Sequence, residues 1–105
     1  MISRHWKGIA KRELADRYVE HLRADTFPQL ATLPGFVRAS ILRRDVTDGV
    51  EFRIVTLWRS LPDIAAFAGA DLEVAVVPAN VRAMMIRFDD RVAHYEVADT
   101  FEIRT

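Results

Sequence analysis

The residues Phe52-Arg-Ile-Val-Thr-Leu-Trp-Arg-Ser-Leu-Pro-Asp-Ile-Ala-Ala-Phe-Ala-Gly69 encode a β-strand that turns directly into a short helix. Alternate side chains of a strand share one face, so one face of this strand is expected to carry Phe52, Ile54, Thr56 and Trp58. The opposite face carries apolar residues as well. We therefore predict a strand over residues 50–59 that is covered on both sides.

Signals for the start and the end of a helix follow this strand. Ser60 is a typical N-cap residue. Pro62 suits the first helical turn, because the N–H groups of that turn have no partner within the helix and proline has no N–H to leave unpaired. Gly69 is typical of a helix C-terminus. These signals predict a helix over residues 61–68.

The rest of the chain alternates between strand and helix patterns. Strand patterns cover residues 2–9, 36–45 and 91–98, and a helical apolar stripe covers residues 11–26, with His21 at its edge. We expect Pro28 to break or kink this helix, and Asp48-Gly49 to provide a positive φ in the hairpin over 46–49. Residues 71–77 are expected to add a turn or two of helix, and residues 79–90 an irregular lid.

This order of elements, β-α-β-β-α-β, predicts an α+β, ferredoxin-like fold with an antiparallel sheet. Two helices cover only one face of such a sheet. The other face is expected to expose apolar side chains, namely Val37, Ala39, Ile41, Val55, Leu57, Tyr95 and Val97. We therefore expect a homodimer that buries sheet against sheet, with the tail over residues 99–105 packed on the partner.

Composition excludes several classes of function. The 105 residues form one expected domain, and 15 basic residues balance 15 acidic ones in an interleaved pattern, unlike the basic stripe of a nucleic-acid-binding protein. There is no cysteine, so thiol catalysis and thiolate metal sites are excluded. With no apolar signal segment or membrane-spanning run, we expect a cytoplasmic protein that binds neither nucleic acid nor membrane.

Four short motifs carry a family resemblance: Arg4-His-Trp-Lys-Gly8, Trp58-Arg-Ser60, Phe67-Ala-Gly69 and His94-Tyr-Glu-Val97. With the order of elements, they resemble the antibiotic biosynthesis monooxygenase superfamily of dimeric α/β-barrel proteins over nearly the whole chain. The resemblance implies one domain of this type over residues 1–105, paired as a dimeric α/β barrel.

The resemblance also implies an activity without metal or flavin. Family oxygenases remove a proton from a phenol or anthrone, and the resulting carbanion passes an electron to O₂ on the way to a peroxide and a quinone. Here Trp58 would wall the pocket, His94 or His5 would act as the base, and Arg38 would hold an anion. Further pocket residues would be Tyr18, Met84 and Met85.

Competing interpretations stay open at several of these positions. Trp58 also fits an ordinary core, and His94 a structural hydrogen bond. The three histidines lie on different expected elements without metal-ligand spacing, so we expect no metal site and no cofactor. Residues 66–78 lack the iron-ligating histidine of the haem-degrading branch, which argues against haem degradation.

A second function is a non-catalytic homodimer of the same fold that binds a small apolar or aromatic ligand. It is favoured because the first strand lacks the polar partner, often asparagine, that family oxygenases carry. The candidates there are Ser3, His5 and Lys7 on one face, and Arg4 on the other.

Overall fold

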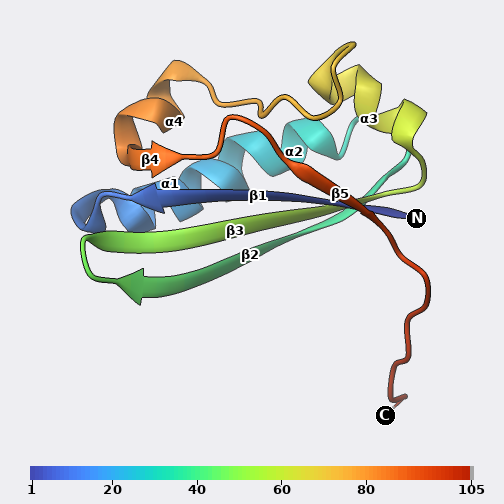
Figure 1. The fold of residues 1–105 in the computed structure, drawn as a ribbon, viewed down its shortest axis with the longest axis horizontal. Helices are drawn as coiled ribbons and strands as arrows, with labels where there is room; N and C mark the ends of the chain where they lie inside the picture. The colour runs from blue at the N-terminus through green and yellow to red at the C-terminus, as the bar shows by residue number, and fades with distance from the viewer. Residues whose placement is uncertain (105) are drawn as a thin grey trace.

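Helices cover one face of an antiparallel sheet in the computed structural model, which describes residues 1–104 (Figure 1). Thr105, the last residue of the expected tail, lies outside the described residues. The strands are β1 (Ile2–Ala10), β2 (Phe36–Val46), β3 (Gly49–Trp58), β4 (Met85–Phe88) and β5 (Ala93–Glu96). Their order is β2-β3-β1-β4, and β5 also pairs with β1. The predicted α+β, ferredoxin-like fold is confirmed.

The strand expected over residues 91–98 is present as the shorter β5, and the unexpected strand β4 pairs with the opposite end of β1. Between them, residues 89–92 turn toward the segment over residues 71–77. The Ala75 N–H donates to the Asp90 carbonyl at 2.8 Å, and the Val92 N–H donates to the Glu73 carbonyl at 2.8 Å. The backbone groups of this stretch are thus satisfied outside the sheet, and the ladder is interrupted.

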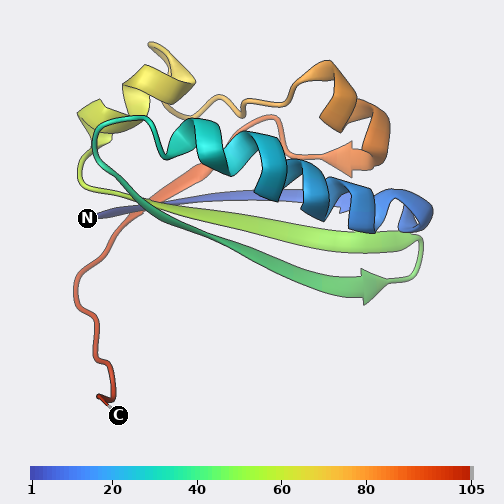
Figure 2. The same cartoon turned by 180° about the vertical axis from the view of Figure 1, so that it is seen from behind.

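One continuous helical rod crosses the sheet (Figure 2). It consists of a 3₁₀ turn η1 (Arg12–Leu14), α1 (Ala15–His21), a wider π turn η2 (Leu22–Thr26) and α2 (Phe27–Leu30). Pro28 does not break the rod, and its effect is the π turn that ends just before it. In a regular α-helix the Pro28 ring would clash with the carbonyl four residues earlier. The π turn relieves this clash, because the Phe27 N–H bonds to the Leu22 carbonyl, five residues back.

The remaining helices are α3 (Leu61–Ala68) and α4 (Ala79–Met84). The helix predicted over 61–68 is confirmed, with Ser60 accepting a bond from the Asp63 N–H and Gly69 ending it at φ 86°. The helix expected over 71–77 is absent. The segment begins with one turn, in which the Val74 N–H bonds to the Asp71 carbonyl, and bonds to Asp90 and Val92 then prevent a helix. Residues 79–90 are not an irregular lid but contain α4 and β4.

The hairpin between β2 and β3 differs from its prediction. Val46 pairs with Gly49, so Thr47 and Asp48 form the turn, and positive φ occurs among residues 1–104 only at Gly35 and Gly69. Gly49 is needed for a different reason. A Cβ at this position would lie 2.3 Å from the Ala10 carbonyl oxygen, so only glycine allows the two strands to approach here.

The faces of β3 are as predicted, whereas those of β2 are not. Phe52, Ile54, Thr56 and Trp58 are buried under the helices. In β2 the pairing shifts between Phe36 and Arg38, and this bulge turns Ala39 and Ile41 toward the helices. The uncovered face therefore lacks two of its expected apolar residues but keeps Val55, Leu57, Tyr95 and Val97.

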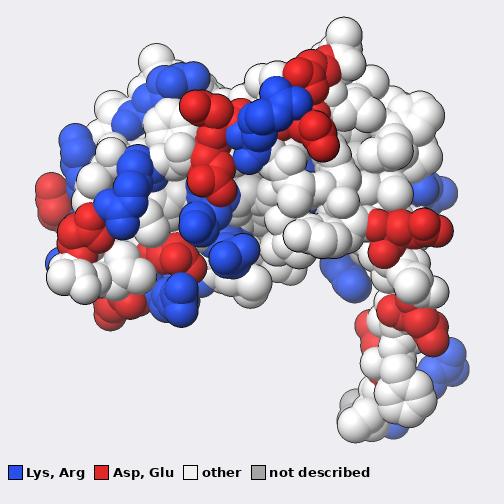
Figure 3. Space-filling model, viewed as in Figure 1, with Lys and Arg blue, Asp and Glu red and all other residues white. Residues whose placement is uncertain are grey.

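Acidic and basic side chains lie beside each other on the surface (Figure 3). Arg91 pairs with Asp71 and Glu73, and Arg87 pairs with Asp48. The face shown carries no field of one sign, in line with the balanced composition. None of the helices within residues 1–104 has the length and apolarity to span a membrane.

Candidate functional site

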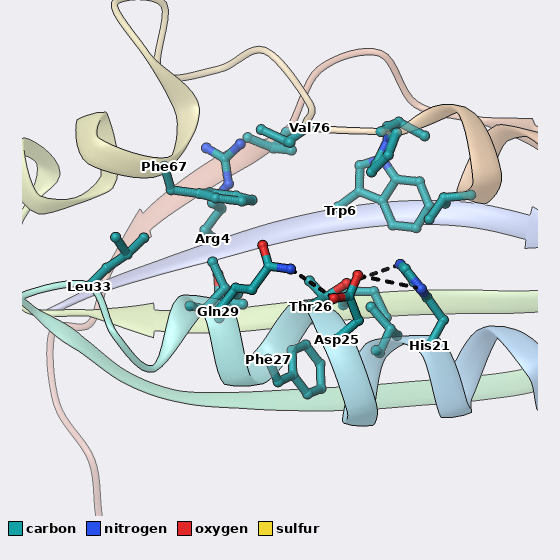
Figure 4. Close-up of a pocket in the computed structure, with 18 of the residues that line it drawn as sticks. Arg4, Trp6, His21, Asp25, Thr26, Phe27, Gln29, Leu33, Phe67 and Val76 are labelled. Atoms are coloured by element: carbon teal, nitrogen blue, oxygen red, sulfur yellow. Dashed lines mark hydrogen bonds and ion pairs between the residues drawn. The ribbon is translucent and has the colours of Figure 1, made fainter.

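A cavity of about 560 Å³ lies between the helix-covered face of the sheet and the elements above it (Figure 4). Its floor comes from β1 and β3, one wall from η2 and α2, and the other walls from α3, residues 76–78 and α4. Most of the lining side chains are apolar or aromatic, including Trp6, Phe27, Leu30 and Phe67. Volumes and linings of this kind are typical of small-molecule sites.

Arg4 places a buried positive charge in the cavity wall. The residue is only 4% exposed, and its guanidinium donates to the carbonyls of Leu72 and Val74, the latter at 2.9 Å. Its Nη1 lies 2.9 Å from Nε2 of His94. Among residues 1–104 no carboxylate forms an ion pair with Arg4. Burial lowers the pKa of Arg4 to about 10, so it stays charged at neutral pH.

His94 holds the Arg4 guanidinium from β5. Because guanidinium nitrogens only donate, Nε2 of His94 is the acceptor, and the neutral ring carries its proton on Nδ1. Partial burial and the neighbouring Arg4 charge lower the pKa of His94, while Glu73 acts in the opposite direction. The base predicted at His94 thus has a ring nitrogen that accepts from a charged guanidinium, which opposes its protonation.

This arrangement predicts a loss of stability in mild acid. Unfolded His94 takes up a proton near pH 6.5, but the folded protein does so only at lower pH, so the unfolded state binds more protons between the two values. The free energy of unfolding should therefore fall as the pH drops below about 7, and fall less in His94→Gln. A ring titration by NMR checks the cause: a His94 pKa at or above 6.5 would contradict it.

Polar groups gather on the wall formed by the π turn. Thr26 Oγ1 lies 3.2 Å from Nε2 of His21, and Nδ1 of the same ring lies 3.9 Å from an Asp25 carboxylate oxygen. Gln29 Nε2 donates to the other Asp25 oxygen at 2.8 Å. All four residues line the cavity, and Figure 4 shows their side chains together on one side of it. The cavity thus has a histidine–carboxylate pair and, from β1, a separate cation.

Tyr18 lies in the cavity wall, where the sequence analysis placed it. Its ring packs edge-on against Phe52 with the centroids 4.9 Å apart, and lies beside Trp6. Burial raises the pKa of Tyr18 well above its usual range, so the hydroxyl stays protonated.

Trp58 does not line the cavity. Its side chain is fully buried (0% exposed), with its ring between Phe36 and Phe67. Its Nε1–H donates to Thr56 Oγ1 at 2.9 Å. Because Phe67 and Thr56 line the cavity and Trp58 lies behind them, a ligand would touch these two residues first.

The other expected site residues lie away from the cavity. His5 is on the uncovered face, where it bonds to Ser3 and packs edge-on against Tyr95, and partial burial lowers its pKa. Arg38 is exposed on β2, opposite Leu57. Met84 and Met85 pack in the core at the other end of β1. The structure therefore unites Tyr18 with residues that the sequence analysis did not select.

The residues that were missed had weak signals in the sequence. Arg4 shares a strand face with Ile2 and Trp6, so it was a charged residue on a face expected to be buried. His21 and Asp25 stand four residues apart, a spacing that places them on one helix face. What local patterns did not indicate is that both groups face one cavity. Among residues 1–104 no three side chains of His, Cys, Asp or Glu are clustered to hold a metal ion.

The sequence matches no protein-family model and no curated protein. Its fold, however, is similar to that of several solved structures. A candidate antibiotic biosynthesis monooxygenase from Bacillus cereus aligns with a TM-score of 0.66 and 16% identity, over 99% of this chain and 97% of that chain. SnoaB from Streptomyces nogalater, a cofactor-independent oxygenase, aligns with a TM-score of 0.65 and 16% identity, over 94% of each chain.

A third structure, a candidate antibiotic biosynthesis monooxygenase from Deinococcus radiodurans, aligns with a TM-score of 0.66 and 14% identity, over the full length of both chains. At such identities the similarity establishes the shared fold. The resemblance noted in the sequence motifs is thus matched by the architecture, and the chemistry must be argued from the cavity itself.

Proposed function

We propose that this chain, whose fold is that of the monooxygenase structures above, is a cofactor-independent monooxygenase acting on a small aromatic, phenol-like substrate. The observation that carries the proposal is the cavity of about 560 Å³, which joins apolar walls to a histidine–carboxylate pair and a buried arginine. A reaction that runs through a carbanion needs these three things: a place for an apolar ring, a base and a cation near the developing negative charge.

Each part of the cavity has a role in this proposal. The substrate ring would lie against Phe67, Phe27 and Trp6. His21 would take the proton, and the Asp25 carboxylate, 3.9 Å from its Nδ1, would stabilise the imidazolium that forms. Arg4 would stabilise the enolate or phenolate oxygen, with His94 as the residue that positions it.

The reaction balances with O₂ as the co-reactant. The base removes a proton from the carbon that becomes oxidised, and the carbanion gives one electron to O₂, forming superoxide and a substrate radical. Their combination makes the new C–O bond of a peroxide anion, which takes back a proton. Loss of water then leaves the quinone oxygen on carbon, so that one oxygen atom enters the product and the other leaves as water.

The homodimer belongs to the same proposal. Val55, Leu57 and the 57%-exposed Tyr95 leave an apolar patch on the uncovered face of the sheet. The C-terminal tail leaves the body beyond this face, with Phe101 93% exposed and Ile103 83% exposed (Figure 1). A second copy packed sheet against sheet would cover both features. We also propose that residues 1–105 form a single domain and that the protein is cytoplasmic, in keeping with its lack of cysteine.

Oxygen uptake with a panel of anthrones and hydroquinones tests the activity. The native protein should consume O₂ faster than the spontaneous reaction, and His21→Gln should be slower by about a hundredfold, because a general base contributes that much. The matched variant His5→Gln changes a histidine on the opposite face of the sheet, and it should change the rate by less than about twofold. Equal losses in the two variants would contradict His21 as the base.

The same assay separates the oxygenase from the second function. No uptake above the spontaneous rate with any member of the panel, while ligands still quench tryptophan fluorescence, would favour the non-catalytic binding protein. Trp6 lines the cavity and Trp58 lies behind Phe67, so a bound ring is expected to affect both fluorophores.

A further inference from the structure

The charge on Arg4 lacks a counter-charge although the residue is almost fully buried. Burying a cation without a neutralising partner costs several kcal/mol in general, because backbone dipoles replace only part of its hydration. Its partners here are two carbonyls and a neutral imidazole, and none of them is an anion. The folded protein therefore holds a positive charge that a bound anion would neutralise.

The guanidinium also keeps donors free. Of its five N–H groups, the two on Nη1 go to the Leu72 carbonyl and His94, and one on Nη2 goes to the Val74 carbonyl. Within residues 1–104, neither the Nε–H nor the second Nη2–H forms a hydrogen bond. No enclosed side-chain nitrogen of these residues lacks a partner, so the unbonded Nε reaches open space. The Nε–H and the second Nη2–H form the side-on fork that binds a carboxylate with two parallel hydrogen bonds.

Apolar surface lies directly beside this fork. The Phe67 ring centre is 5.6 Å from the Arg4 guanidinium carbon, and both residues line the cavity together with Leu30 and Val76. Figure 4 shows Arg4 rising from β1 past Phe67 toward the segment that carries Val76. A flat ring against Phe67 thus places a substituent of that ring within reach of the fork.

We propose that the ligand of this cavity is an aromatic carboxylate, whose carboxylate pairs with Arg4 while its ring packs on Phe67. The inference rests on the proposed function only in taking the cavity as the substrate site. It names the substrate as an aromatic acid rather than a neutral phenol, and it pairs Arg4 with the substrate carboxylate instead of the enolate or phenolate oxygen. It holds equally for the non-catalytic binding protein. His94 holds the Arg4 guanidinium in place. Because the His94 ring is neutral, the positive charge of Arg4 is left to be neutralised by the carboxylate of the ligand.

Calorimetric titration with three naphthalene probes tests the inference near neutral pH. 2-Naphthoate should bind the native protein at least about tenfold more tightly than 2-naphthamide, a neutral molecule of the same shape, or 2-naphthol, which is neutral until ionised. In Arg4→Met the preference for naphthoate should disappear while the naphthamide affinity stays within about twofold. Arg17→Met removes an exposed helix arginine and should keep the preference.

Two further measurements keep the test decisive if Arg4→Met folds poorly. Naphthoate should raise the melting temperature of the native protein more than equimolar naphthamide does, because it binds the folded state more tightly. Arg4→Lys keeps the charge but loses the fork, and should retain only part of the preference. Equal affinity of naphthoate and naphthamide for the native protein would overturn the inference, as would a preference that survives in Arg4→Met.

Failure of this inference and failure of the oxygenase give different results. Oxygen uptake with neutral anthrones, together with equal binding of the two probes, would refute the aromatic acid and keep the oxygenase. A naphthoate preference that depends on Arg4, together with no oxygen uptake, would support the anion site at Arg4 and refute the oxygenase, so that the protein would be a non-catalytic binding protein.

Discussion

Replacing Leu57 by aspartate is expected to convert the proposed homodimer to a monomer in light scattering at micromolar concentration. Leu57 lies on the uncovered face of β3, between Ser3 and Arg38 on the neighbouring strands. In a dimer that packs sheet against sheet, the new carboxylate would lose its hydration without a partner, which costs several kcal/mol. The dissociation constant should rise by at least about a hundredfold.

Leu61→Asp is the matched control for this experiment. Leu61 is also an exposed leucine, but it lies on α3 in the helix layer, away from the uncovered face of the sheet. This variant should keep the native mass. A native protein that already scatters as a single chain of 12.0 kDa would rule out the dimer, and a Leu57→Asp protein that keeps twice this mass would move the interface to another surface.

Trp58→Ala should lower the free energy of unfolding by about 3–5 kcal/mol, the cost of removing a large aromatic side chain from a core. Trp58 is fully enclosed, packs on Phe36 and Phe67, and is the hydrogen-bond donor to the Thr56 hydroxyl. Urea denaturation at one fixed protein concentration measures the change, since a dimer would make stability depend on concentration.

Two other variants test whether the loss of stability in Trp58→Ala comes from lost packing. Trp58→Phe keeps an aromatic ring and should lose less than half as much stability as Trp58→Ala. Leu61→Ala, at an exposed position, should change the free energy of unfolding by less than about 0.5 kcal/mol. A cost below about 1 kcal/mol for Trp58→Ala would contradict the enclosed position and would restore Trp58 as a flexible pocket wall.

Local sequence patterns were sufficient to predict β3 and α3. Strand alternation predicted the buried face that carries Phe52 and Trp58, and Ser60 and Gly69 predicted both ends of the helix. The order of elements led to the ferredoxin-like fold, and the helical stripe placed Tyr18 against the sheet. These features depend on residues close together in the chain, whose backbone preferences and periodicity can be read directly.

Other features depended on contacts between distant parts of the chain. The bulge in β2 turned Ile41 to the face opposite the expected one. Gly49 is required because its strand approaches the Ala10 carbonyl closely, and not because it adopts a positive φ. Residues 71–77 did not form a helix because they bond to residues 90–92 and to Arg4. In each case a long-range hydrogen bond or a steric limit outweighed a local preference.

The candidate site shows the same division most clearly. Composition and periodicity indicated an aromatic, apolar interior, and this is what the cavity walls contain. That Arg4 meets His94, ninety residues later, and that Phe67 stands between Trp58 and the cavity, followed from packing alone. A charged side chain has no periodicity that reveals its partner, so the unneutralised guanidinium became visible only once the sheet had brought β1 beside β5 and the segment over residues 71–77.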